Sequence, residues 1–176
     1  MIGRPPRSTL FPYTTLFRSS DLLNEATICC PLVSNSRNGA IQELLNHLQS
    51  LGHLSATIKL YHYIEELENN HSTAAGKGVA YPHSTSMEVS DLICVLGISK
   101  TGLDFNSPDG QLCHIILLSL SPKEDPRKHR KFITLFRSMI SDSNIRPQIL
   151  EGNNSMDVSN IITNWEDDDT LADDLQ

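Results

Sequence analysis

Two short apolar segments separated by a turn constrain the fold of this chain most strongly. The segments are DLICVLGIS at 91–99 and QLCHIILLSL at 111–120, and both are rich in branched side chains. Runs of this length and composition are typical of strands that are buried on both faces. Between them, Pro108-Asp109-Gly110 has the residue types of a tight turn. The sequence therefore predicts a sheet that contains two buried strands.

Helical segments are expected before these strands. In 34–54 and 56–70, apolar residues recur at the spacing of one helix face. Ser34 or Ser36 is a candidate N-cap for the first helix, which Gly52 would end, and Ser55 is a candidate N-cap for the second. We expect these two segments to form a helical hairpin.

Further elements follow along the chain. GVAYPH at 78–83 predicts a short strand that ends at Pro82, because proline cannot donate a hydrogen bond to a neighbouring strand. A helix is expected in 125–142, with Asp125 as its cap and Pro126 in the first turn, and shorter helices in 145–152 and 155–165. Helices, then strands, then helices predict an α/β fold, a three-layer α/β/α sandwich with a mixed sheet.

The two ends of the chain differ in character from this domain. Residues 1–22 have no helical or strand period, and TLFPYTTLFRS closely resembles a translated sequencing adapter. We therefore interpret 1–22 as an artefactual, disordered leader, 23–165 as the domain, and 166–176 as an acidic disordered tail. The alternative for the leader is a basic arm that binds nucleic acid or anionic lipid.

Charge and cysteine usage exclude several classes of function. The formal net charge is −7, and it becomes −9 without residues 1–22, so a non-specific nucleic-acid binder is not expected. No apolar run is long enough to span a membrane. Cys29, Cys30, Cys94 and Cys113 lack metal-ligand spacing, and we expect reduced thiols in a cytoplasm and neither metal nor cofactor.

His83 is the main candidate for chemistry. It follows Pro82 at the end of a short predicted strand, and Ser84 comes next. A neutral imidazole is a good nucleophile near neutral pH and forms a phosphoramidate that transfers phosphate readily. The alternative is a surface histidine at a strand end, and the local pattern alone favours that alternative.

A wider set of motifs resembles a known family. HSTAAGKGVAYPH, LDFNSPDGQLCHIILLSLSP and DPRKHRKFITLF occur in that order. Together they resemble the enzyme IIA domain of the mannitol/fructose type (type 2), from the bacterial phosphoenolpyruvate-dependent sugar phosphotransferase system, a family that includes nitrogen-related regulatory members. The resemblance covers roughly residues 23–165.

The resemblance implies a role for each matching residue. His83 would be the phosphoryl acceptor, and His129 would lie in the same pocket, where it hydrogen-bonds the phosphoryl group or orients His83. Further candidates for the phosphate pocket are Thr73, Lys77, Gly78 and Ser84. The implied partners are an HPr-like phosphocarrier and an enzyme IIB domain or a regulatory target.

One position departs from the family pattern. Leu67 stands where the family usually has an arginine that neutralises phosphate charge, followed here by Glu68. Lys77, Lys128 or Arg130 could substitute for it if they reach the pocket. Three functions therefore remain open at this point: a phosphocarrier for sugar uptake, a regulator whose phosphorylation controls protein binding, and an interaction module that is not phosphorylated.

Overall fold

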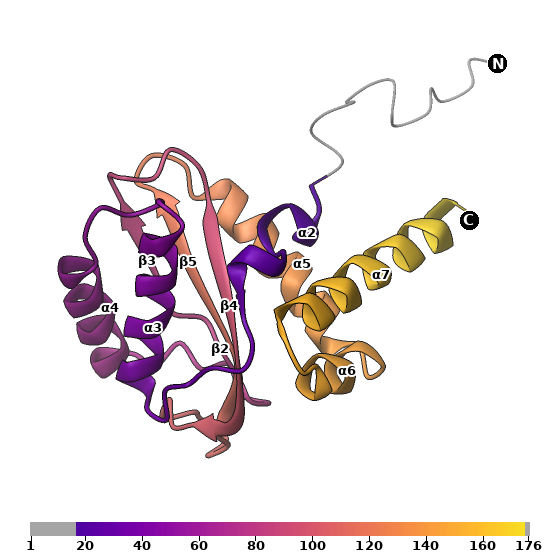
Figure 1. Ribbon diagram of the computed structural model, residues 1–176, viewed down its shortest axis with the longest axis horizontal. Coiled ribbons are helices and arrows are strands. Elements are labelled where there is room, and N and C mark those ends of the chain that lie inside the picture. The colour runs from indigo at the N-terminus through magenta and orange to yellow at the C-terminus, as the bar shows by residue number, and fades with distance from the viewer. Residues whose placement is uncertain (1–16, 175–176) are drawn as a thin grey trace.

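The central layer of the molecule is a mixed five-stranded sheet, seen in a computed structural model that describes residues 17–174 (Figure 1). Its strands are β1 (Ile28–Cys29), β2 (Val79–Ala80), β3 (His83–Ser86), β4 (Ile93–Leu103) and β5 (Cys113–Pro122). The order is β1-β4-β5-β2, with β3 also paired to β5. The pair β4–β5 is antiparallel and the other pairs are parallel.

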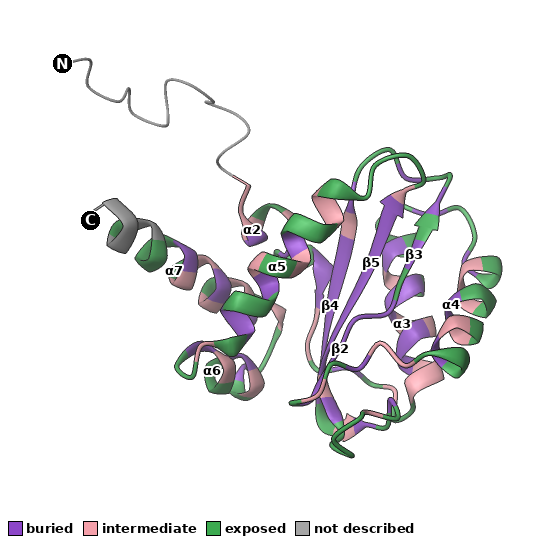
Figure 2. Cartoon of the chain, turned by 180° about the vertical axis from the view of Figure 1, so that it is seen from behind, coloured by how far each residue is buried: buried purple, intermediate pink, exposed green. Residues whose placement is uncertain are grey.

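The two long strands β4 and β5 confirm the prediction from the apolar segments. Most of their residues are buried, because helices cover both faces of the sheet (Figure 2). Cys94 on β4 and Cys113 on β5 are among the fully buried residues. The short strand β1 was not predicted, since its two residues carry no period of their own.

Helices α3 (Arg37–Ser50) and α4 (Ile58–Asn70) cover one face of the sheet (Figure 1). Ser36 caps α3, and its Oγ accepts a hydrogen bond from the backbone N–H of Gly39 at 3.1 Å. The expected cap Ser55 does not cap α4, which begins after Thr57. Ser55 instead hydrogen-bonds the carboxylate of Glu88, so a tertiary contact occupies its hydroxyl.

Helices α5, α6 and α7 lie on the opposite face, together with α2 (Figure 1). The bounds are α2 (Ser19–Leu22), α5 (Arg127–Ser141), α6 (Ile145–Glu151) and α7 (Ser155–Asp174), and a 3-10 turn spans Glu25–Thr27. Pro126 is the N-cap position of α5, one residue before its first turn. Asp125 Oδ1 accepts from the backbone N–H of Arg127 at 3.1 Å, which satisfies one free donor at the helix start.

Two apolar clusters hold the three layers together, one on each face of the sheet. Cys94, Leu96 and Leu117 belong to the cluster under α5 and α7. Val95, Ile116 and Leu118 belong to the cluster under α3 and α4. Side chains of a strand alternate between faces, so one pair of strands supplies both clusters. This arrangement is the predicted three-layer α/β/α sandwich.

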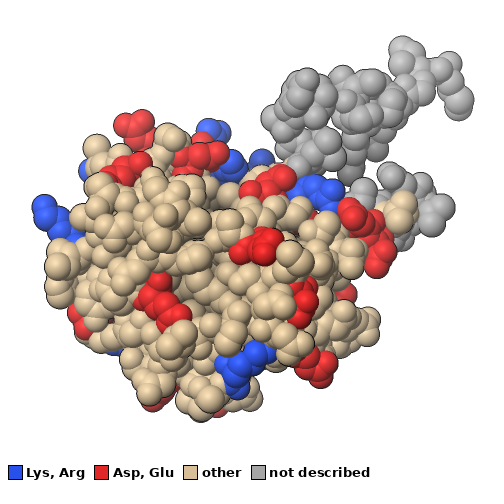
Figure 3. All heavy atoms as spheres, in the orientation of Figure 1, with Lys and Arg blue, Asp and Glu red and all other residues tan. Residues whose placement is uncertain are grey.

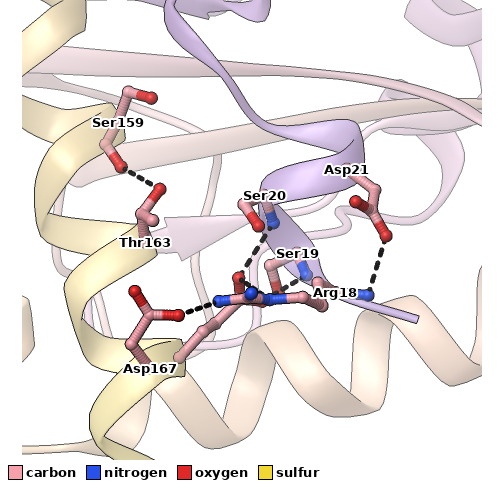
Figure 4. Close-up of polar contacts among 8 residues, drawn as sticks. Arg18, Ser19, Ser20, Asp21, Ser159, Thr163 and Asp167 are labelled. Atoms are coloured by element: carbon pink, nitrogen blue, oxygen red, sulfur yellow. Dashed lines mark hydrogen bonds and ion pairs between the residues drawn. The ribbon is translucent and has the colours of Figure 1, made fainter. Parts of the chain in front are cut away.

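Both ends of the chain were expected to be disordered, but the parts of them that the structure describes are largely helical. Residues 17–22 include α2, and α7 extends through most of the expected tail. Glu166, 6% exposed, accepts hydrogen bonds from the backbone N–H groups of Ser19 and Ser20, and Arg18 pairs with Asp167 (Figure 4). Through these contacts the acidic segment packs against residues 18–20, which its composition alone does not indicate. The rest of the leader, 1–16, lies outside the described residues.

Two further observations concern the charged side chains and the helices of the described residues. On the face drawn in Figure 3, Lys and Arg are dispersed among Asp and Glu and form no continuous basic area. Among the described residues, no helix combines the length and the apolar character needed to cross a membrane.

Candidate active site at the start of β3

His83 is the first residue of β3 and its side chain is exposed. The predicted strand 78–83 is divided: β2 ends at Ala80, and pairing to β5 resumes at His83. Pro82 lies at this break, where its carbonyl still accepts from the N–H of Ser119 at 3.1 Å. The break leaves His83 at the beginning of a new strand.

One hydrogen bond determines the tautomer of His83. Its Nδ1 lies 2.9 Å from the carbonyl oxygen of Tyr81. Because a carbonyl oxygen only accepts, Nδ1 carries the hydrogen of the neutral ring. The lone pair is therefore on Nε2, and this nitrogen is the one able to attack an electrophile.

His129 lies beside His83, as the motif pattern predicts. It is in the first turn of α5, and the two ring centroids are 5.5 Å apart. His129 is half-buried, and its Nε2 is buried without a hydrogen-bond partner among the described residues. Burial, followed by the charge of His83, lowers the pKa of His129. Both causes favour the neutral form of the His129 ring.

Ser119 is a site residue that the sequence did not indicate. It pairs with His83 in the parallel register of β3 and β5, and partners in register place their side chains on the same face of the sheet. That is the face of α5, since Ser119 Oγ also accepts from the Cys94 thiol at 3.6 Å. No local motif could have revealed it, because the pairing joins residues 36 positions apart.

Ser84 does not share this face. Residues along β3 alternate between exposed and buried, so Ser84 points away from His83 toward the helices α3 and α4. Its hydroxyl donates to the carbonyl of Thr85 at 2.9 Å. The structure thus places the Ser84 side chain on the opposite face of the sheet from His83, and a contribution of Ser84 to the pocket stays a prediction.

The side chain of Thr73 takes part in a hydrogen-bond network that links Glu68 to Tyr81. Its hydroxyl donates to Glu68, a carboxylate 3% exposed, which also accepts the backbone N–H of Thr73 at 3.1 Å. The same hydroxyl oxygen accepts from the N–H of Tyr81 at 3.2 Å. Because Tyr81 holds the ring of His83, Glu68 and Thr73 position the segment that orients the candidate nucleophile.

Lys77 and Gly78 lie at a distance from His83. Gly78 is next to Val79, which pairs with Ile115, whereas His83 pairs with Ser119. Four residues of strand span about 13 Å. The two residues line a different part of the surface, and their assignment to the pocket of His83 is not supported by this geometry.

The described residues contain no group of three or more His, Cys, Asp or Glu side chains arranged to hold a metal ion. The chemistry of the two histidines requires none, since imidazole is itself a nucleophile and a hydrogen-bond donor.

Comparison with known proteins identifies the family to which this chain belongs. Residues 21–165 match the family described as "Phosphoenolpyruvate-dependent sugar phosphotransferase system, EIIA 2". The chain belongs to this enzyme IIA family.

Relatives within the family differ in their printed roles. The fructose-specific EIIABC component of Bacillus subtilis is 27% identical over 143 residues, which are 81% of this chain and 22% of that protein. The nitrogen regulatory protein of Bradyrhizobium diazoefficiens is 25% identical over 130 residues, 74% of this chain and 84% of that protein. The chain thus spans about a fifth of the EIIABC relative.

Solved structures show the same fold. Nitrogen regulatory protein IIA-Ntr from Neisseria meningitidis has a TM-score of 0.73 at 20% identity, covering 81% of this chain and 97% of that one. IIA mannitol from Escherichia coli has a TM-score of 0.67 at 15% identity, covering 80% and 98%.

The three cations that could replace the family arginine in this enzyme IIA domain have different surroundings. Leu67 occupies the usual arginine position, on α4. Lys128 is paired with Asp91 at 2.7 Å, and Lys77 lines the other surface described above. Of the three proposed substitutes, Lys77 and Arg130 form no ion pair among the described residues, and Arg130 follows His129 directly in the sequence.

Proposed function

We propose that this chain is a phosphocarrier that accepts a phosphoryl group on Nε2 of His83. The donor is the phosphohistidine of an HPr-like carrier protein. The lone pair of Nε2 attacks phosphorus in line, the P–N bond to the carrier breaks, and its electron pair stays on the carrier's ring nitrogen. The observation that carries the proposal is the hydrogen bond from Nδ1 to the Tyr81 carbonyl, which directs the lone pair to the other nitrogen.

The Tyr81 carbonyl has a second task in this reaction. Phosphorylation of Nε2 leaves positive charge on a ring that still carries the Nδ1 hydrogen, and the carbonyl oxygen stabilises that charge. The phosphorylated ring is thereby kept in the orientation from which it passes the phosphoryl group on.

His129 responds to the new charge. In the unphosphorylated protein its pKa is lowered, first by burial and then by His83. A phosphoryl group on His83 replaces a repulsive neighbour by an anion, which raises the pKa of His129 and favours donation of a hydrogen bond to phosphate oxygen.

We propose that the phosphoryl group passes next to an enzyme IIB domain, in the cytoplasm, for sugar uptake. A solved structure with this fold, at 14% identity and a TM-score of 0.68, is a complex of enzyme IIA mannitol with phosphorylated enzyme IIB mannitol. The second candidate is a regulator whose phosphorylation controls protein binding. It is favoured by the nitrogen regulatory relative, which the match covers over 84% of its length.

The test is phosphorylation of the full chain by enzyme I, HPr and labelled phosphoenolpyruvate. We expect acid-labile label on the unchanged protein, none on His83→Ala, and full labelling of His53→Ala, which removes an exposed histidine outside the site. Label retained by His83→Ala would refute the assignment of the acceptor. No label on a folded protein would favour the interaction module.

Transfer of the phosphoryl group from His83 to a second protein distinguishes the phosphocarrier for sugar uptake from the regulator. Incubating the labelled protein with enzyme IIB domains of the fructose and mannitol classes is expected to move the label to a IIB protein. A label that stays on His83 with each of them would instead support the regulator.

A further inference from the structure

A groove lies on the α5 and α6 side of the molecule, and neither His83 nor His129 is among its lining residues. It has a volume of ≈ 580 Å³, and it is lined by the loop at 75–77, by Val79 and Tyr81, and by residues from the end of α5 to the start of α6. A space of this size suits a small organic ligand. The mechanism proposed above does not use it.

Three cations from three segments line this groove. They are Lys77 in the loop before β2, Arg137 on α5 and Arg146 on α6. None of the three forms an ion pair among the described residues. The single carboxylate of the lining, Asp142, accepts from Trp165 Nε1 at 3.0 Å and from the N–H of Asn144 at 2.8 Å. The lining therefore carries a formal charge of +2 on a chain whose net charge is −7.

Both arginines are placed by groups that carry no negative charge. The guanidinium carbon of Arg137 lies 5.0 Å from the centroid of the Tyr81 ring, in cation–π geometry. Arg146 Nη2 lies 3.2 Å from where a Cβ on residue 78 would be, so the glycine there gives the guanidinium its room. Guanidinium groups held in this way keep their donors available for an anion.

We propose that this groove binds a small phosphate-bearing molecule. A phosphate monoester carries close to two negative charges near pH 7, which matches the charge of the lining. Arginine pairs with phosphate through two parallel hydrogen bonds, and the lining offers two arginines and one lysine from three different segments. Val79, Ile140 and Pro147 supply apolar wall for the carbon body of the ligand.

Tyr81 connects the groove to the candidate active site. Its ring lines the groove under Arg137, and its carbonyl accepts the Nδ1 hydrogen of His83. A ligand in the groove is thus positioned to influence the rate of phosphorylation of His83. This consequence rests on the proposed function, whereas binding itself does not.

Binding is tested with the full, unphosphorylated chain and glycerol 3-phosphate, with glycerol as the uncharged match and inorganic phosphate as a second probe. Amide chemical shifts of an assigned NMR spectrum locate the site, and calorimetry gives the affinity. We expect shifts at Lys77, Tyr81 and Arg146, and none with glycerol. Arg146→Gln and Lys77→Gln should each weaken binding about tenfold or more.

Arg127→Gln is the matched control, since Arg127 is on α5 but outside the groove and paired with Asp125. It should bind as the unchanged protein does, and so should His83→Ala. Equal loss in Arg127→Gln and Arg146→Gln, or shifts confined to β3 and the first turn of α5, would overturn the proposal. Thermal melts of each variant confirm that folded proteins are compared. Retained binding by a chain that cannot be phosphorylated would leave this inference standing while the proposed function fails.

Discussion

At the scale of single residues, the two histidines of the site have different surroundings. His83 is exposed and its Nδ1 is fixed by a backbone carbonyl, whereas His129 is half-buried and its Nε2 has no hydrogen-bond partner within residues 17–174. Burial disfavours the charged form of an imidazole, and a neighbouring imidazolium disfavours it further. The two residues are therefore suited to different roles, His83 as acceptor and His129 as the group that responds to the acceptor's charge.

The pKa of His129 gives the first prediction. Titration followed by NMR should show a pKa below the ordinary value of about 6.5. In His83→Gln this pKa should rise but stay below the ordinary value, because burial is the larger cause and remains. An unchanged pKa in that variant would show that the rings do not interact.

A stability effect follows from the same shift. A base with a lowered pKa in the folded state binds fewer protons there than in the unfolded chain. The contribution of His129 is thus fully present above about pH 6.5 and is lost as the pH falls from there through its folded pKa. Urea unfolding at several pH values should show this loss, and His129→Gln should reduce it.

Leu67 gives a prediction of gained activity. An arginine here would add a cation on α4, which contacts β3, and a charge-assisted hydrogen bond to phosphate can accelerate transfer by about tenfold or more. Leu67→Arg should therefore be phosphorylated faster by the HPr-like carrier. Ile58→Arg is the control, because Ile58 is 66% exposed at the other end of the same helix. Equal rates in both variants would mean that charge at position 67 does not reach the phosphate.

At the scale of elements, Glu68 and Thr73 join α4 to the segment that carries His83. Glu68→Gln replaces an acceptor of two hydrogen bonds by an amide, which leaves one buried donor unsatisfied. The free energy of unfolding should fall by about 1–3 kcal/mol. Urea denaturation measures this fall, with Glu66→Gln as an exposed neighbour on the same helix. Similar values for the two variants would show that the buried contacts do not stabilise the loop.

The elements that could be predicted are those whose pattern is local. The apolar segments became β4 and β5, and the periodic segments became α3, α4 and α5. The second half of α7 was missed because its inward face continues with Glu166, an acidic residue after the apolar Val158 and Ile162. Its burial depends on donors from the N-terminal segment, and no local pattern shows such a contact.

Residues of the candidate site could be predicted where family motifs identified them individually. They could not be predicted where the geometry of extended strands decides which residues are neighbours. Lys77 and Gly78 are near His83 in sequence, but strand geometry separates them from it. Ser119 is far from His83 in sequence, but pairing brings it alongside. Neighbours across a sheet depend on register, which the sequence of one strand does not contain.

At the scale of the whole molecule, the two apolar clusters share one sheet. Cys94 belongs to the cluster under α5 and α7, and Cys113 to the cluster under α3 and α4, so each thiol reports on one side. Burial raises the pKa of Cys94 to about 12 and that of Cys113 to about 11. Since the thiolate is the reactive form, both should resist alkylation in the folded protein.

Alkylation with iodoacetamide across a urea series tests whether the two sides unfold together. Because β4 and β5 supply both clusters, loss of either side removes packing from the other, and we expect one cooperative transition. Mass spectrometry of the labelled peptides should give the same midpoint and the same urea dependence for Cys94 and Cys113. Cys30, which is only half-buried, should react at lower urea through local opening. A lower midpoint for Cys113 than for Cys94 would show that the α3–α4 layer detaches first, and the molecule would then consist of two stability units joined by the sheet.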